Sequence, residues 1–288
     1  MKIELRKMDI LLLVLIGVVF CYSFFISGTR VIEVEKTTDF QFSVSKVKPA
    51  VVKIFAETEL KNIPYVGDYI SLNDKIYSGG TGFFVSDDGK IATEAHVVGD
   101  SNNIVVFVQN EQSQYTATIL EKNKDADLAI IKIAKISTPS VKMANFESVA
   151  EGEEVGFIGY PLYFQIPLLT KGIISAKGNY KLDDTLNPIK LSIINSFVNR
   201  GNSGGPLFKA KTGEVIGIVN SRSKTNEVAN QIIRLPDNYS PGMTIGGVDP
   251  ITLSVETYNR AVGLIGDVSQ IGIGFSASSD YITELIQK

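Results

Sequence analysis

Short apolar runs separated by turn residues recur along the chain from about Val44 onward. Many of these runs are rich in β-branched and aromatic residues, which favour strands. Their spacing predicts an all-β sandwich or barrel of roughly a dozen strands, divided into two halves near residues 140–152. The predicted strands lie at residues 51–56, 82–86, 90–93, 104–108, 115–120, 128–133, 155–159, 172–176, 215–219 and 271–275.

Turn and helix signals complete this pattern. Asp88-Gly89 predicts a tight hairpin between the runs at 82–86 and 90–93, because glycine accepts the positive φ that such turns require. The C-terminus predicts a helix that Ser278 or Ser279 caps, since the apolar side chains following it share one helical face. Those side chains are Ile282, Leu285 and Ile286. A weaker helix is predicted at 252–263, within a long stretch at 223–270 that is rich in Asn, Gly, Pro and Ser.

The N-terminus carries one uninterrupted apolar segment, Ile10–Ile26, which has no charged residue. Its length is at the lower limit for a helix that spans a membrane. Positive charges precede it at Lys2, Arg6 and Lys7, which predicts a cytoplasmic N-terminus with the rest of the chain outside. Two alternatives remain open, a cleaved signal peptide, for which residues 27–29 are only a weak cleavage site, and a buried core helix.

These signals predict the domain organisation. We expect a cytoplasmic tail at 1–8, one transmembrane helix at 9–27, a linker at 28–43 and a folded domain at 44–288. The two halves of that domain are expected at about 44–140 and 150–288.

Composition removes several classes of function. The net charge is −3 and no long basic run occurs, so nucleic acid is not expected as a partner. The one cysteine, Cys21, lies in the apolar N-terminal segment, so the folded part is expected to have no disulfide and no cysteine-based metal site. The one histidine, His96, excludes most zinc sites, because these use several imidazoles. We expect no metal and no cofactor.

The segment Arg200–Pro206 reads RGNSGGP and is the most informative in the chain. A serine nucleophile must stand on a tight turn, where neighbouring backbone N–H groups can bind the oxyanion that forms when it attacks a carbonyl. Gly201, Gly204 and Gly205 permit such a turn around Ser203. The alternative is an ordinary glycine-rich turn with a solvated serine.

Two further residues fit the chemistry of a serine hydrolase. His96 follows a strand-like segment, and histidine is the natural base for a serine hydroxyl near neutral pH, although a half-buried core histidine is the alternative. Asp127 lies directly before the apolar run at 128–133, where a carboxylate must be hydrogen-bonded, for example to an imidazole. Asp125 is the alternative orienting group, and both carboxylates could instead lie on the surface.

The chain order His, Asp, Ser is that of the chymotrypsin-like fold. More narrowly, the sequence resembles the HtrA (Deg) family of serine proteases over nearly all of residues 44–288. The segments that carry the resemblance are VKPAVVKI at 47–54, GTGFFV at 80–85, HVV at 96–98, DLAIIKI at 127–133, TKGIISA at 170–176, NRGNSGG at 199–205 and IGIGF at 271–275.

This resemblance implies two six-stranded antiparallel β-barrels of the chymotrypsin type with the site in the cleft between them. It implies that Ser203 is the nucleophile, His96 the base and Asp127 the residue that orients the imidazole. The N–H groups of Gly201 and Ser203 would form the oxyanion hole. The PDZ domain usual in the family is expected to be missing, and the stretch 223–270 could act as a lid or a partner-binding arm.

The resemblance also suggests a substrate pocket and an assembly. The pocket walls are expected from Phe197, Val198, Asn220, Ser221 and Ile273, although these could simply be core residues. None of them is acidic, which predicts cleavage after small or medium aliphatic residues. HtrA relatives often form trimers through aromatic N-terminal segments, and in this sequence Phe40 and Phe42 are the candidates.

The leading hypothesis is therefore a membrane-anchored serine endopeptidase that hydrolyses extracytoplasmic polypeptides, periplasmic or extracellular, through an acyl-enzyme. A protease-like binding or sensing module with an inactive or trigger-dependent site is the main alternative. An esterase is a third possibility, but the G-x-S-x-G motif of the α/β-hydrolases is missing.

Overall fold

The computed structural model describes most of the chain beyond residue 39. The described residues are 40–59, 69–72, 75–111, 113–161, 164–181, 186–220, 233–236, 238–268 and 272–287. The membrane anchor predicted at 9–27 and the pocket residue Ser221 lie outside them. Within these ranges, no helix is both long enough and apolar enough to cross a membrane.

The first half of the domain forms a closed antiparallel barrel. Its strands run in the order β1-β5-β6-β7-β4-β3, and pairing of β3 with β1 closes the ring, while β2 extends β3 as a short added strand. The bounds are β1 (Val51–Thr58), β2 (Tyr69–Leu72), β3 (Lys75–Phe84), β4 (Lys90–Glu94), β5 (Ile104–Val108), β6 (Gln114–Asn123) and β7 (Leu128–Ile133). The predicted hairpin joins β3 to β4, and Gly89 has a φ of 91° there.

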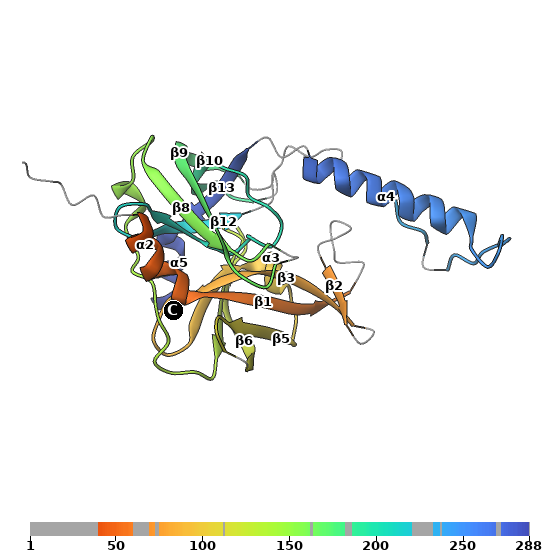
Figure 1. The fold of residues 1–288 in the computed structure, drawn as a ribbon, viewed down its shortest axis with the longest axis horizontal. Helices are drawn as coiled ribbons and strands as arrows, with labels where there is room; N and C mark the ends of the chain where they lie inside the picture. The colour runs from red at the N-terminus through yellow and green to blue at the C-terminus, as the bar shows by residue number, and fades with distance from the viewer. Residues whose placement is uncertain are drawn as a thin grey trace, which may run out of the picture. The chain divides into compact units, whose positions relative to one another are not determined.

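The second half forms another closed barrel, in the order β10-β13-β12-β11-β8-β9 (Figure 1). The prediction of two six-stranded antiparallel barrels is therefore confirmed. The bounds are β8 (Glu154–Gly159), β9 (Leu168–Tyr180), β10 (Ile189–Asn195), β11 (Pro206–Lys209), β12 (Val215–Asn220) and β13 (Ile273–Ser278). Sequence analysis missed β2, β10 and β11.

Three apolar clusters explain why several strands are continuous hydrophobic runs in the sequence. In β7, Ala129, Ile131 and Ile133 lie in the core of the first barrel. Leu128 and Ile130 point the other way, into a cluster that also contains Ile158, Phe208 and Ile218 of the second barrel. Successive side chains of a strand point to opposite faces, so both faces of β7 are covered. A third cluster fills the second barrel.

Several short helices connect or follow the strands. The predicted C-terminal helix is present as α5 (Ser279–Gln287), with Ile282 and Leu285 buried, and the Ser278 hydroxyl accepts a hydrogen bond from the Asp280 N–H at 3.1 Å. α3 (Ala95–Val98) follows β4 directly. The described residues also include the 3₁₀ helices η1 (Lys48–Ala50) and η3 (Phe146–Ser148).

A helix that sequence analysis missed, α2 (Phe40–Val47), crosses the predicted boundary between linker and domain. The Phe40 ring stacks on Phe208 with 6.0 Å between centroids, whereas Phe42 is exposed. Phe40, one of the two residues proposed for trimer contacts, is therefore packed within its own chain.

The long stretch at 223–270 contains α4 (Pro250–Val268), which is longer than the helix predicted at 252–263. Asp249 caps it by accepting hydrogen bonds from the N–H of Ile251 at 3.2 Å and of Thr252 at 3.0 Å. Pro250 suits the first helical position, because its missing N–H has no partner in that turn. A role for this stretch as a lid stays a prediction.

Candidate active site

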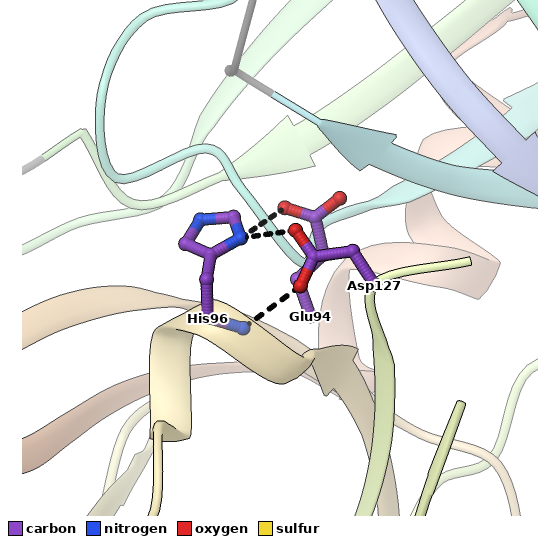
Figure 2. Close-up of side chains that lie close together, drawn as sticks. All are labelled: Glu94, His96 and Asp127. Atoms are coloured by element: carbon purple, nitrogen blue, oxygen red, sulfur yellow. Dashed lines mark hydrogen bonds and ion pairs between the residues drawn. The ribbon is translucent and has the colours of Figure 1, made fainter. Parts of the chain in front are cut away.

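His96 and Asp127 are hydrogen-bonded to each other. The Nδ1 atom of His96 lies 2.6 Å from Oδ2 of Asp127, and the backbone N–H of His96 donates to Oδ1 at 2.9 Å. The other ring nitrogen points away from the carboxylate (Figure 2). Two hydrogen bonds from one residue to one carboxylate fix both the position of the residue and the plane of its ring, so the far nitrogen can act as a base.

The turn before β7 aims the Asp127 carboxylate at His96. Asp127 has a φ of 53°, in the left-handed region that aspartate tolerates better than most residues. Its carbonyl accepts a hydrogen bond from the N–H of Ala95 at 2.7 Å. Asn220, at the end of β12, donates from Nδ2 to Oδ2 of Asp127 at 3.4 Å. This carboxylate is thus held by groups from both barrels.

Asp125, the alternative orienting residue, is engaged elsewhere. Its carboxylate accepts hydrogen bonds from the backbone N–H of Asn187 at 3.1 Å and from Nδ2 of the same residue at 2.9 Å. These bonds hold the pKa of Asp125 below its ordinary value. Of the two carboxylates weighed from the sequence, Asp127 is the one at the imidazole.

Glu94 brings a second carboxylate to the same imidazole. It is the last residue of β4, its side chain is 0 % exposed, and Oε2 lies 3.6 Å from Nδ1 of His96. Figure 2 shows both carboxylates approaching the same ring nitrogen. Glu94 was not predicted as a site residue, because the segment that ends with it was interpreted only as the strand before the histidine.

Ser203 stands on two consecutive turns, each of which requires a glycine. The N–H of Asn202 donates to the Asn199 carbonyl at 3.0 Å, and the N–H of Gly205 donates to the Asn202 carbonyl at 2.9 Å. Gly201 and Gly204 are the third residues of these turns, and each has a φ of 88°. A positive φ at the third position is typical of type II turns. The backbone conformation of these two turns therefore explains why Gly201 and Gly204 are glycines.

The turn around Ser203 is held against the first barrel. The N–H of Thr81, on β3, donates to the Ser203 carbonyl at 2.9 Å. A Cβ placed on Gly204 would lie 2.0 Å from the Thr81 carbonyl oxygen and 2.5 Å from Oγ1 of Thr93. Thr93 precedes Glu94 on β4, the strand that leads into α3. The backbone next to Ser203 thus packs against the end of the strand that carries His96 into place.

Thr81 links this turn to the first barrel, a role that was not predicted from the sequence. Its hydroxyl is fully buried, donates to the Gly201 carbonyl at 2.6 Å and accepts from the N–H of Tyr160 at 2.8 Å. Within the described part of the chain, no hydrogen bond uses the N–H of Gly201, one of the two groups predicted for the oxyanion hole. Burial raises the pKa of Tyr160 to about 12, so its phenol is neutral at physiological pH.

The residues predicted for the pocket walls differ in exposure. Phe197 is 60 % exposed and Ile273 is 44 % exposed, and the Phe197 ring lies over Gly272. Val198 is buried in the core of the second barrel. Asn220 is also buried and contacts Asp127, as described above.

A metal is not needed to explain the cluster around His96. Glu94, His96 and Asp127 are the one group among the described residues whose ligand atoms lie close enough together to hold an ion, all within 4.8 Å of one another. The 2.6 Å separation of Nδ1 and Oδ2 is accounted for by a hydrogen bond.

Part of the chain is similar to a known protein family and to curated proteins. The family described as the trypsin-like peptidase domain matches residues 80–218. A probable periplasmic serine endoprotease, DegP-like, from Pseudomonas putida is 40 % identical over 139 residues, which are 48 % of this chain and 28 % of the relative. Its counterpart in Hahella chejuensis is 32 % identical over 201 residues, which are 62 % of this chain and 42 % of the relative. The alignments thus span less than half of either relative.

Solved structures share the fold. The HtrA-type protease AlgW with a tripeptide gives a TM-score of 0.59 at 22 % identity, covering 86 % of this chain and 62 % of that one. The Rv3671c protease from M. tuberculosis, in its active form, gives 0.57 at 21 % identity, covering 85 % and 83 %. The two closed barrels agree with these matches. Residues 80–218 of this chain therefore match the trypsin-like peptidase domain, the chain is similar in sequence to DegP-like endoproteases, and it shares the fold of the HtrA-type protease AlgW.

Proposed function

We propose that this protein is a serine endopeptidase in which Ser203 is the nucleophile, His96 the base and Asp127 the residue that orients the imidazole. The observation that carries the proposal is the double hydrogen bond from His96 to Asp127, at 2.6 and 2.9 Å. Ser203 supports it by standing on a glycine-built turn whose carbonyl accepts a hydrogen bond from Thr81 of the first barrel.

The proposed reaction assigns each proton. The Ser203 hydroxyl attacks the carbonyl of a peptide bond and gives its proton to Nε2 of His96. The imidazolium then passes this proton to the leaving amine, and water hydrolyses the acyl-enzyme by the reverse sequence. The N–H groups of Gly201 and Ser203 bind the oxyanion. The positive φ of Gly201 supports this role, because it belongs to the tight turn that carries both N–H groups.

The substrate is proposed to be a polypeptide outside the cytoplasm. Related proteins are named as probable periplasmic endoproteases, and the structural neighbour AlgW was solved with a tripeptide. We propose cleavage after small or medium aliphatic residues, which the exposed apolar surfaces of Phe197 and Ile273 support. Anchoring through residues 9–27, and assembly through the exposed Phe42, complete the proposal.

Fluorophosphonate labelling tests the nucleophile directly. The wild-type protein is expected to be labelled and to digest casein, whereas Ser203→Ala is expected to lose labelling and roughly a thousandfold or more of its activity. Ser45→Ala, at an exposed serine on α2, is the matched control and is expected to behave as wild type. Equal labelling of Ser203→Ala and wild type contradicts the assignment. A wild-type protein that is never labelled supports the binding-module alternative.

A further inference from the structure

A cluster of exposed apolar side chains precedes and opens α4, in the connection between β12 and β13. The exposed fraction is 66 % for Met243 and Ile245, 50 % for Val248, 53 % for Ile251 and 52 % for Leu253. We call these five residues the apolar tip. Exposed apolar side chains that occur singly are normal on a protein surface, whereas a group of them marks a surface that contacts another molecule. Neither the proposed reaction nor the proposed pocket uses these residues.

A tight hairpin fixes the shape of the apolar tip. The N–H of Ile245 donates to the Val248 carbonyl at 2.9 Å, and the N–H of Val248 donates to the Ile245 carbonyl at 3.1 Å. Between them, Gly246 and Gly247 have φ values of 61° and 83°, as a two-residue turn of type I′ requires. A Cβ on either glycine would meet nothing within 4 Å. The hairpin therefore borders open space, and its flanking backbone groups are paired with each other rather than with water.

The one charge in this region is hydrogen-bonded within it. From Asn238 to Val255 the sequence contains a single charged residue, Asp249, whose exposed fraction is 9 %. Its carboxylate accepts hydrogen bonds from the Tyr239 hydroxyl at 2.9 Å, from the N–H groups of Ile251 and Thr252, and from the Thr252 hydroxyl at 2.5 Å. The apolar tip is thus exposed, while the charge beside it is largely withdrawn from solvent.

These features suit the hydrocarbon edge of a bilayer better than a protein partner. A charge in hydrocarbon is costly unless it is hydrogen-bonded, and so is an unpaired backbone N–H or C=O group. Protein interfaces impose neither condition, because they carry a polar rim and many hydrogen bonds across the contact. Asp249 has four donors and the hairpin pairs its own backbone groups, so the region meets both conditions. The tip has no lysine or arginine, so apolar burial rather than attraction to anionic headgroups would hold it.

The proposed anchor keeps a bilayer within reach of the apolar tip. Anchoring through residues 9–27 is part of the proposed function, on which this inference rests. The 12 residues 28–39 separate that segment from α2 and span at most about 40 Å when fully extended. This length is roughly the diameter of a compact domain of about 250 residues. An anchored domain therefore stays close enough to the bilayer for a surface hairpin to reach the lipid.

We propose that the apolar tip inserts into the leaflet that faces the domain, with Met243 and Ile245 in contact with the acyl chains. The tip is then a second point of membrane attachment, separate from residues 9–27. One flexible connection leaves a domain free to turn relative to the bilayer, whereas two connections restrict its orientation.

The chain contains no tryptophan, so one introduced tryptophan reports from a single place. Full-length Ile245→Trp is reconstituted into vesicles of phosphatidylcholine, with and without bromine atoms on the acyl chains, which quench a tryptophan that contacts them. Its emission is expected to shift to shorter wavelength and to be quenched by the brominated lipid. Ile136→Trp, at a residue that is 80 % exposed in the connection after β7, is the matched control and is expected to show neither effect.

A second variant tests whether apolar contact drives the insertion. Met243→Asp, added to Ile245→Trp, places a charge on the tip and is expected to weaken the quenching, because a charged side chain is costly in hydrocarbon. Quenching that this charge leaves undiminished overturns the inference. Both residues are exposed, so neither change disturbs the core, and thermal unfolding checks this. If Ile245→Trp is destabilised, Val248→Trp, at the residue paired with it in the hairpin, is expected to give the same shift and quenching.

The outcomes separate this inference from the proposals on which it rests. Vesicle-bound Ile245→Trp that the brominated lipid does not quench overturns the inference and leaves the anchor standing. A shift to shorter wavelength without quenching also overturns it, and assigns the tip to a protein contact such as a second copy of this chain. Protein that does not float with the vesicles removes the anchor and the inference together. Fluorophosphonate labelling of Ser203 is expected to be unchanged in every tip variant, so it decides the nucleophile independently.

Discussion

Asp88 shows how a single, partly exposed carboxylate contributes to stability in the hairpin between β3 and β4. It binds Lys132 at 2.7 Å and also accepts a hydrogen bond from the Ser86 hydroxyl. The Lys132 ammonium, together with Ser86, lowers the pKa of Asp88 from 3.8 to about 2. A carboxyl whose folded pKa is depressed stabilises the fold above its unfolded pKa, and this stabilisation is lost as the pH falls through the folded value.

Asp88→Asn is therefore expected to lower the free energy of unfolding at neutral pH and to flatten its decline between the two values, 3.8 and about 2. The effect is expected to be small, since the pair is partly exposed and solvent screens it. Urea unfolding of both proteins at neutral and acidic pH measures this. An unchanged acid dependence would show that the pair adds nothing to stability.

At the level of residues, the sequence could identify the proposed triad but not its surroundings. His96 was found because it is the only imidazole, and Asp127 because a carboxylate at the start of an apolar strand needs a partner. Glu94 and Thr81 lie inside strands, where alternation predicts only which face a residue occupies. The contact of Glu94 with His96 depends on the chain turning into α3 immediately after β4. No local residue pattern predicts that turn.

The turns around Ser203 give a prediction at the level of elements, with Gly152 as a matched control. Both Gly204 and Gly152 have a positive φ, 88° and 84°, but a Cβ at Gly204 would meet the Thr81 carbonyl oxygen at 2.0 Å, whereas one at Gly152 would meet nothing within 4 Å. Gly152→Ala is expected to lower the free energy of unfolding by about 1 kcal/mol, the cost of the left-handed backbone alone, and to keep labelling.

Gly204→Ala is expected to lower the free energy of unfolding further and to abolish fluorophosphonate labelling, because the turn must move away from Thr81. Urea unfolding and labelling rates measure both effects. Equal losses in the two variants would mean that close packing against Thr81 does not position Ser203.

Elements were predictable where their composition was uniform. The runs at 104–108 and 128–133 match β5 and β7 residue for residue, since β5 is entirely apolar and Lys132 is the one polar residue of β7. β11 was missed because it has only four residues and begins with Pro206, which usually argues against a strand. α2 was missed because its burial depends on the second barrel, where Phe40 stacks on Phe208.

At the scale of the whole molecule, Thr81 joins the barrels through buried hydrogen bonds to Gly201 and Tyr160. Thr81→Val keeps the volume but removes the hydroxyl, and is expected to lower the free energy of unfolding by about 2 kcal/mol or more, because a buried carbonyl and a buried N–H lose their partner. It is also expected to slow labelling, since the Gly201 turn loosens.

Thr81→Ser is the control for this prediction, because it retains the hydroxyl and is expected to preserve most of the labelling rate. Urea unfolding and labelling kinetics of the two variants give the comparison. A Thr81→Val protein that labels at the wild-type rate would contradict a role for Thr81 in holding the turn.

The division of the site between two barrels has a consequence for synthesis. His96 and Asp127 belong to the first barrel, while Ser203 lies on a loop of the second that Thr81 of the first must hold. While the polypeptide emerges from the ribosome, the proposed base, His96, is synthesised well before the proposed nucleophile, Ser203. In the proposed reaction, therefore, no peptide bond, its own included, is attacked until translation has supplied both halves and they have docked.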